Sequence, residues 1–309
     1  MRRIRIATRR SRLAMTQAEF VASRLRASEP SLRVELVGVT SQGDRDQSPS
    51  LAQRGGKSSF VGALEGAVRD GRADLAVHSM KDVAVRVPDG FALHTFGPRA
   101  DVCDALVVAD GSSPTLTALP SGARVGTASI RRRALLLTLR RDLVVVPVRG
   151  NVDTRLKHLD AGGYDALLLA CAGLDRLGLG GRIGQRVDAE VLVPAPGQGA
   201  LAVELLAERE DLDALVRTGM DSEVERAVAA ERQVTRRLGA DCAMPFGAYC
   251  TVREDALKLT TVAADADGTR MLRVELSGDD PVALGDDAAA RLRKLGVGDL
   301  LGAPADDAG

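Results

Sequence analysis

A short apolar run ends in a charged pair, Lys81 and Asp82, and this ending is the most suggestive chemical feature of the chain. The run Asp74-Leu-Ala-Val-His-Ser-Met-Lys-Asp82 is typical of a strand that stops at polar residues. Ligands of open α/β sheets bind outside the carboxyl ends of strands, so a carboxylate placed there can face a ligand while its strand stays buried. Asp82 is therefore the first candidate for a catalytic residue. The competing interpretation is a structural aspartate paired with Lys81.

Arginines and hydroxyl residues follow three other expected strands. The clusters are Thr8-Arg-Arg-Ser11, Thr127-Ala-Ser-Ile-Arg-Arg-Arg133 and Arg149-Gly-Asn-Val-Asp-Thr-Arg155. Helix N-termini favour anions, and the planar guanidinium fork suits carboxylates and phosphates. A single cluster of this kind is more often a solvated surface. Three clusters at equivalent places in the pattern predict a polyanionic ligand.

Composition limits the class of protein. The chain has 309 residues, 45% hydrophobic and 27% charged, which is typical of a globular protein of two or three domains. Its net charge of zero argues against a nucleic-acid or membrane-surface partner. The four cysteines and three histidines have no metal-ligand spacing, so no metal site is expected. The N-terminus lacks an apolar stretch of about 7 to 15 residues, which predicts a cytoplasmic protein.

Strand and helix patterns alternate along the chain and predict an α/β fold. The first series comprises a strand at 4–8, a helix at 11–27 and a strand at 33–39, followed by a polar loop at 40–57 that we interpret as a mobile lid. The second series has strands at 105–109, 124–127, 143–148 and 166–170. A strand at 200–205 is expected to return to the first series. A helix at 220–238, strands at 247–252, 256–264 and 271–277, and a helix opened by Pro281 complete the pattern.

Segments rich in Pro and Gly at 96–100 and 194–199 mark two crossings between domains. The predicted division is a discontinuous first domain at 1–98 and 199–217, a second domain at 99–198, and a small α+β third domain at 218–309. Two crossings imply a hinged cleft between the first two domains.

The motifs together resemble the porphobilinogen deaminase family, also called hydroxymethylbilane synthase. The matching segments are His78-Ser-Met-Lys-Asp82, Gly126-Thr-Ala-Ser-Ile-Arg-Arg132, Arg149-Gly-Asn-Val152, Pro194-Ala-Pro-Gly-Gln-Gly-Ala200 and a cysteine shortly before Pro245. They occur in the family's order and cover nearly the whole chain. The resemblance implies two α/β domains like those of periplasmic binding proteins around a cleft, plus a small C-terminal α+β domain.

The resemblance also implies a transferase that joins four porphobilinogen molecules head to tail, with loss of ammonia, into a linear tetrapyrrole. It assigns Asp82 as the catalytic carboxylate, and Cys242 as the thioether attachment point of a dipyrromethane cofactor. The expected cofactor ligands are Lys81, Thr127, Ser129, Arg131, Arg132 and Arg155. The expected substrate ligands are Arg9, Ser11, Lys57, Arg149, Arg176 and Gln198. Arg10 and Arg133 are expected to face solvent. A monomer that hands its product to a uroporphyrinogen-III-forming enzyme of heme biosynthesis is implied.

The chain departs from the family pattern at Gln53, Ser58, Cys103, Asp153 and Asp241, and two of these departures add negative charge near the expected site. Two other function classes therefore stay open. One is a degenerate paralogue that binds pyrroles without joining them. The other is a bilobed anion-binding or effector-sensing module, although the chain shows neither an export signal nor a DNA-binding element.

Overall fold

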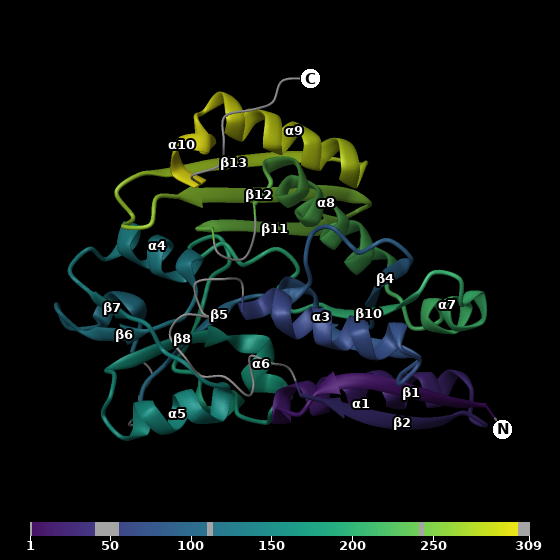
Figure 1. Cartoon of the computed structure of the whole chain (residues 1–309). Helices are drawn as coiled ribbons and strands as arrows, with labels where there is room; N and C mark the ends of the chain where they lie inside the picture. The colour runs from purple at the N-terminus through teal and green to yellow at the C-terminus, as the bar shows by residue number, and fades with distance from the viewer. Residues whose placement is uncertain (1, 41–55, 110–113, 241–243, 302–309) are drawn as a thin grey trace. The chain divides into compact units, whose positions relative to one another are not determined.

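The computed structural model describes residues 2–40, 56–109, 114–240 and 244–301, with the backbone alone for residues 56–60 (Figure 1). Its contacts divide the chain into two compact units, Met1–Ala100 with Ala200–Glu225 and Asp101–Gly199 with Arg226–Gly309. Most of the predicted lid, including Gln53, lies outside the described residues. So do Asp241 and Cys242.

The first unit is built on a five-stranded sheet in the order β2-β1-β3-β10-β4. Its strands are β1 (Arg3–Arg9), β2 (Arg33–Val39), β3 (Leu75–Ser79), β4 (Phe91–Phe96) and β10 (Leu201–Leu206). β1 runs parallel to both β2 and β3, while β10 pairs antiparallel with β3 and β4. The predicted return of the chain at 200–205 is therefore confirmed. β4 was not predicted.

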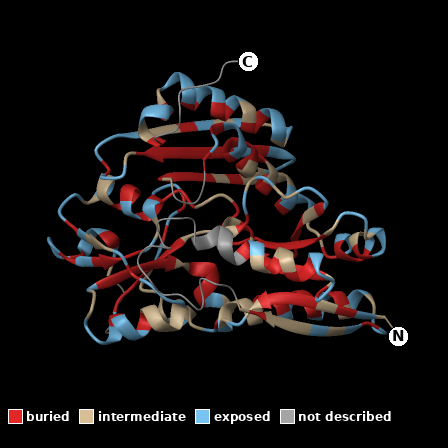
Figure 2. Ribbon diagram, in the orientation of Figure 1, coloured by how far each residue is buried: buried red, intermediate tan, exposed pale blue. Residues whose placement is uncertain are grey.

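Helices cover both faces of this sheet because each presents one apolar side. Buried residues of α1 (Arg12–Ser28) and α7 (Glu210–Arg217) pack with Ile4 and Ile6 on one face. Residues of α3 (Gly56–Arg69) pack with Ala7 and Ala76 on the other. In Figure 2 most strands of this sheet are buried, β2 is mostly intermediate, and the helices have exposed sides. Alternate strand residues thus serve two separate cores.

The second unit contains a five-stranded sheet in the order β7-β6-β8-β5-β9. Its strands are β5 (Asp104–Val107), β6 (Arg124–Gly126), β7 (Val144–Val146), β8 (Ala166–Ala170) and β9 (Gln185–Val187). α4 (Ile130–Leu139) covers one face, and α5 (Val152–Asp160) and α6 (Cys171–Arg176) cover the other. The edge strand β9 was not predicted, because its sequence Gln185-Arg-Val187 is mostly polar, unlike the apolar run that contains the equally short β7.

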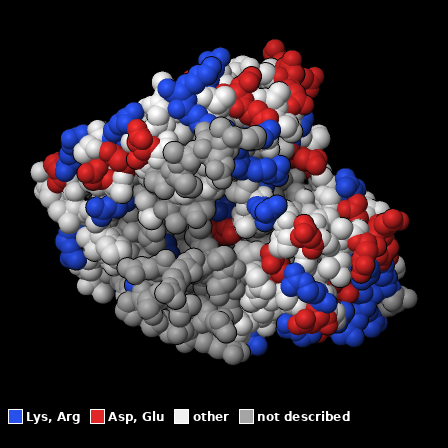
Figure 3. Space-filling model, turned by 45° about the horizontal axis from the view of Figure 1, so that its top comes forward, with Lys and Arg blue, Asp and Glu red and all other residues white. Residues whose placement is uncertain are grey.

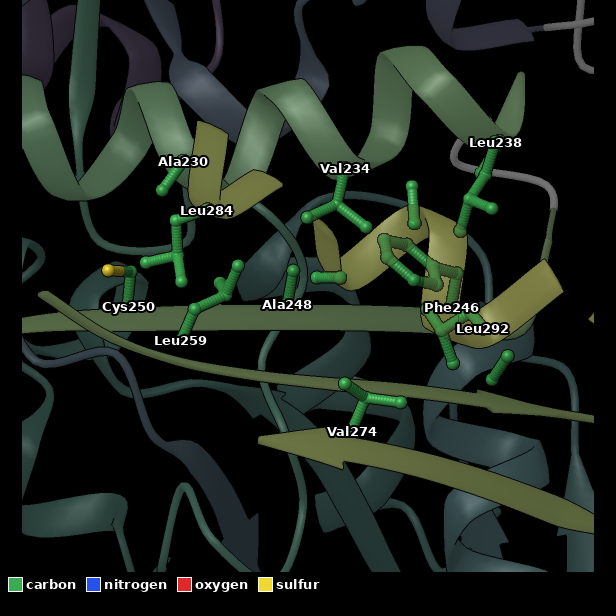
Figure 4. Packing of buried hydrophobic residues seen from close by; sticks show 14 of the residues in the cluster. Ala230, Val234, Leu238, Phe246, Ala248, Cys250, Leu259, Val274, Leu284 and Leu292 are labelled. Carbon is green, nitrogen blue, oxygen red and sulfur yellow. The ribbon is translucent and has the colours of Figure 1, made fainter. Parts of the chain in front are cut away.

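A three-stranded antiparallel sheet in the order β11-β12-β13 follows in the same unit. Its strands are β11 (Phe246–Arg253), β12 (Ala256–Ala264) and β13 (Met271–Gly278), and its helices are α8 (Ser222–Leu238), α9 (Pro281–Lys294) and α10 (Val297–Leu301). One face of this sheet packs against all three helices. Figure 4 shows Val234 and Leu238 of α8 projecting toward Ala248 and Phe246. The other face contributes Val262 and Ala264 to the core around α4.

The third-sheet core makes a direct prediction about stability. Leu259 of β12 is fully buried in the cluster of Figure 4. We expect Leu259→Ala to lower the free energy of unfolding by about 2 to 5 kcal/mol, through lost burial and a cavity. The matched control is Leu295→Ala, because Leu295 is 47% exposed. Denaturant unfolding measures both variants, and equal losses would contradict the assignment of Leu259 to the core.

Candidate active site

The carboxyl end of β3 carries Asp82 on a short 3-10 turn, η1 (Met80–Asp82). The turn is tied to the sheet because Met80 N–H donates to the Ala200 carbonyl (3.0 Å) and Val83 N–H donates to the Met80 carbonyl (3.1 Å). The Gln17 amide of α1 also donates to the Ser79 hydroxyl (2.9 Å). Lys81 and Asp82 are both partly buried. A carboxylate is thus held at a strand end whose backbone is fixed on two sides.

Arg9 and Ser11 lie at the same edge of the sheet, because β1 is the parallel neighbour of β3. Arg9 is the last residue of β1 and is partly buried. The Ser11 hydroxyl accepts the Ala14 N–H (3.3 Å) and so caps α1. The structure therefore groups Arg9 and Ser11 with the turn of Asp82. Lys57 lies in α3, but its side chain is outside the described residues.

Thr127 and Ser129 form the start of α4 in the second unit. Buried Thr127 accepts the Ser129 N–H (3.2 Å), and the Ser129 hydroxyl accepts the Arg132 N–H (3.3 Å). Ser129 is therefore the N-cap of the helix, as its residue type favours. This cap fixes the backbone of the first turn, which carries Arg131 and Arg132.

Arg131 and Arg132 point into the protein and meet one carboxylate, Asp104. Arg131 Nη2 lies 2.8 Å from Asp104 Oδ2, and Arg132 Nη2 lies 2.8 Å from Oδ1. Arg132 Nε donates to the same Oδ1 (3.0 Å). The three side chains are almost completely buried. Two cations facing one anion leave this cluster with an excess positive charge.

The ionised state of Asp104 depends on these neighbours. Burial by itself raises the pKa of the Asp104 carboxyl, but the guanidiniums of Arg131 and Arg132 and the Gln198 amide outweigh it and hold that pKa well below its usual range. Burial lowers the pKa of Arg131, against the opposing effect of Asp104. The carboxylate and its two guanidiniums therefore behave as one charged cluster.

Gln198 belongs to the interior of this cluster. It is fully buried, and its amide nitrogen donates to Asp104 Oδ1 (2.8 Å) and to the Val102 carbonyl (2.7 Å). Arg132 Nη2 donates to its amide oxygen (3.4 Å). The structure thus connects Gln198 to the arginines through Asp104 and Arg132.

Arg176, on α6, is another partly buried cation. Its Nη2 donates to the Gly199 carbonyl (2.7 Å), a neutral partner. Burial lowers the pKa of Arg176 to about 10. A buried guanidinium whose charge is poorly compensated is well suited to receive an anion.

Arg149 and Arg155 flank the start of α5. Arg149 is exposed beyond the end of β7, whereas Arg155 is partly buried and its Nε donates to the Gly150 carbonyl (2.8 Å). Asn151 caps the helix by accepting the Thr154 N–H (2.9 Å). Asp153 stands in the first turn, where the helix dipole favours a negative charge. This departure from the family pattern is therefore compatible with the start of the helix.

The strand ends gather these residues at one edge of the second sheet. β6, β7 and β8 run parallel, so the segments after them meet at that edge. Asp104 joins them because β5 is antiparallel to β8 and pairs Asp104 with Ala170. Sequence reasoning did not identify Asp104 as the partner of Arg131 and Arg132. The available signal was a carboxylate opening an otherwise apolar strand.

The three cysteines that the structure describes lack the lowered pKa or the exposure of a reactive thiol. Burial, followed by the nearby Asp101, raises the pKa of Cys103 to about 12. Burial also raises the pKa of Cys171 to about 12. Cys250 is buried in the third-sheet core. A thiolate, the nucleophilic form, is therefore disfavoured at Cys103 and Cys171.

Surface charge, helix length and the grouping of metal-ligand residue types add three observations. On the face shown in Figure 3, basic and acidic side chains are interspersed. Arg10 and Arg133 are both exposed, as predicted. No helix among the described residues is long and apolar enough to cross a membrane. In the same part of the chain, no group of three or more His, Cys, Asp or Glu residues is placed to hold a metal ion.

Comparison with known proteins identifies the family. The family model "Porphobilinogen deaminase, dipyromethane cofactor binding domain" matches residues 4–214, and "Porphobilinogen deaminase, C-terminal domain" matches residues 226–294. The porphobilinogen deaminase of Paraburkholderia phytofirmans is 48% identical over 301 residues, covering 96% of this chain and 87% of the relative. That of Chromobacterium violaceum is 46% identical over 305 residues, covering 98% of each chain. A probable amino-acid ABC transporter extracellular-binding protein from Bacillus subtilis is 11% identical, with a TM-score of 0.43, covering 71% of this chain and 90% of its own. The two family models and the close relatives establish that this chain belongs to the porphobilinogen deaminase family.

Proposed function

We propose that this chain is a hydroxymethylbilane synthase, which joins four porphobilinogen molecules head to tail with loss of ammonia. The observation that carries this proposal is the excess positive charge at one edge of the second sheet. Arg131 and Arg132 share the single carboxylate of Asp104, and Arg176 has a neutral partner. Each porphobilinogen carries an acetate and a propionate, so the growing chain gains two carboxylates per step. Guanidiniums that are already ordered in the folded protein can form charge-assisted hydrogen bonds with the carboxylates of such a ligand.

The buried arginines also fit a dipyrromethane cofactor, whose side chains are carboxylates. We assign its carboxylates to Lys81, Thr127, Ser129, Arg131, Arg132 and Arg155. When bound, this cofactor supplies the covalently attached pyrrole from which the product chain is extended. Cys242 is the proposed attachment point. The raised pKa of Cys103 and Cys171 and the burial of Cys250 support that choice.

We assign the incoming substrate and the growing chain to Arg9, Ser11, Lys57, Arg149 and Arg176. Arg149 is exposed, whereas Arg155 is partly buried, so Arg149 can follow carboxylates that change position as the chain lengthens. Gln198, the remaining residue expected on the substrate, is buried against Asp104 and accepts from Arg132, so we assign it a role in holding that arginine.

Asp82 is the proposed catalytic carboxylate. Loss of ammonia from porphobilinogen leaves positive charge shared between its methylene carbon and its ring nitrogen. A fixed carboxylate beside the pyrrole N–H stabilises that charge. It can also accept the proton released when the attacking α-carbon forms its new bond. The hydrogen bonds that tie Met80 and Val83 keep the turn of Asp82 in place during both events.

The proposal also covers the domain boundaries, the oligomeric state and the cellular location of the enzyme. We propose three domains, at 1–98 with 199–217, at 99–198 and at 218–309, in an enzyme that works as a monomer in the cytoplasm. Its product is a linear tetrapyrrole that an enzyme forming uroporphyrinogen III then closes.

The role of Asp82 is tested by Asp82→Ala. We expect the rate of porphobilinogen consumption to fall at least about a hundredfold, since removal of one electrostatic stabiliser has that effect in other enzymes. The control is Asp89→Ala, because Asp89 is an exposed aspartate in the following loop. Thermal unfolding shows that both variants are folded. Turnover by Asp82→Ala close to that of the control would remove Asp82 from the mechanism.

The attachment point is tested by intact-mass spectrometry of protein that has not met substrate. We expect wild type to carry an added mass of two pyrrole units, and Cys242→Ser to lack it. Cys103→Ser is the matched control and should keep the adduct, because the Cys103 thiol has a raised pKa. An adduct that survives in Cys242→Ser, or disappears in Cys103→Ser, would place the attachment elsewhere.

The role of Arg149 is tested by Arg149→Leu. We expect elongation to stall, so that protein mixed with porphobilinogen accumulates short covalent oligopyrroles visible by intact mass. Arg133→Leu is the control, since Arg133 is an exposed arginine of the neighbouring cluster. Unchanged steady-state kinetics in Arg149→Leu, with no accumulated oligomer, would count against this assignment.

A further inference from the structure

Residues Val193–Gly199, called here the 193–199 segment, contact three of the arginines assigned to carboxylates. The contacts are Arg131 Nη1 to the Val193 carbonyl (2.8 Å), Arg132 Nη2 to the Gln198 amide oxygen (3.4 Å) and Arg176 Nη2 to the Gly199 carbonyl (2.7 Å). The acceptors lie on a segment without helix or strand structure of its own. The placement of the three guanidiniums therefore depends on whatever holds this segment.

A buried carboxylate from helix α8, Glu231, holds the 193–199 segment in place. Glu231 is fully buried, and its Oε2 accepts the Gly197 N–H (2.7 Å). Its Oε1 accepts the Cys250 N–H of β11 (2.8 Å). One side chain thus joins the 193–199 segment to the third sheet. Hydrogen bonds from backbone N–H groups to a carboxylate are among the stronger ones in proteins.

The same segment packs closely along the outer edge of β11. The Ala248 N–H donates to the Pro194 carbonyl (3.0 Å), beside the Cys250 N–H that Glu231 accepts. A Cβ atom at Gly247 would lie 2.7 Å from the Val193 carbonyl oxygen, so only glycine allows this approach. The edge strand is thereby covered, and the segment has little room to move independently of the third sheet.

We propose that Glu231 is a positioning residue for the carboxylate-binding arginines, and that it couples them to the domain that carries the cofactor cysteine. The coupling runs from α8 through Glu231 and Gly197 to Gln198 and the arginines. In the sequence, α8 ends at Leu238, four residues before Cys242. This inference rests on the proposed function, since it concerns arginines assigned there to carboxylate binding.

The two acceptor oxygens of the Glu231 carboxylate suggest which substitutions test its role. A carboxylate offers two acceptor oxygens, one for each N–H, whereas an amide offers one oxygen and an NH₂ group that cannot accept. Glu231→Gln therefore leaves the Gly197 or the Cys250 N–H without its acceptor while preserving volume. Glu231→Asp keeps both oxygens but withdraws them by one methylene group, and serves if Glu231→Gln does not fold. Thr235→Val is the matched control. Thr235 is a buried residue of α8 whose hydroxyl donates to the Glu231 carbonyl, away from the segment.

Hydrogen–deuterium exchange on purified enzyme without substrate is the first measurement. We expect peptides that contain residues 194–199 to exchange about tenfold faster in Glu231→Gln, as loss of a buried hydrogen bond predicts. Glu231→Asp should show a smaller increase. Thr235→Val should show none, even if its melting temperature falls. Equal exchange of these peptides in Glu231→Gln and Thr235→Val would overturn the positioning role.

Steady-state kinetics on the same proteins is the second measurement. We expect the KM for porphobilinogen to rise about tenfold in Glu231→Gln with a smaller change in kcat, because displaced arginines weaken carboxylate binding throughout the reaction. Thr235→Val should keep both values. An unchanged KM in Glu231→Gln, with normal wild-type turnover, would overturn the coupling alone. A wild-type protein that neither carries the pyrrole adduct nor consumes porphobilinogen would instead overturn the proposed function.

Discussion

The ion cluster of Asp104 with Arg131 and Arg132 is the interaction on which the second unit's site depends. A carboxylate removed from water is costly, by several kcal/mol, unless cations and hydrogen bonds replace the solvent. Here the partners come from α4, and the Gln198 amide adds a further hydrogen bond. The requirement to satisfy one buried charge therefore fixes β5, α4 and the 193–199 segment relative to one another.

The stoichiometry of this cluster also supports its proposed role in binding an anionic ligand. One carboxylate suffices to bring two guanidiniums into the interior, but it neutralises only one of them. The remaining charge favours an anion, and the caps of α4 and α5 already hold the backbone beside it. Exposed Arg149 differs in kind, because a solvated arginine loses side-chain entropy when it orders on a ligand. Buried guanidiniums have already lost this side-chain entropy during folding, so they can bind a ligand carboxylate in one fixed geometry.

Local patterns in the sequence predicted much of this architecture, whereas its long-range contacts were not predictable. Apolar periodicity located α1, β11 and the return strand β10 to within a few residues, and Pro281 marked the start of α9. The site motifs were found because each lies in a contiguous segment. The partner of Arg131 and Arg132 was missed because Asp104 precedes them by 27 and 28 residues and is brought near only by the antiparallel pairing of β5 with β8. The edge strand β9 was missed because Gln185-Arg-Val187 is mostly polar, whereas the equally short edge strand β7 lies in an apolar run.

Two buried carboxylates with different partners hold the 193–199 segment, and the difference has a physical consequence. Gly197 has a φ of 74°, which glycine adopts without strain. Its N–H donates to Glu231, and the side-chain amide of the next residue, Gln198, donates to Asp104. Asp104 is balanced by guanidiniums, for which a ligand carboxylate can compete. Glu231 accepts backbone N–H groups that are buried against β11, and a ligand cannot displace it there. An anionic ligand can therefore draw the arginines away from Asp104 while the segment that carries their other acceptors stays in place.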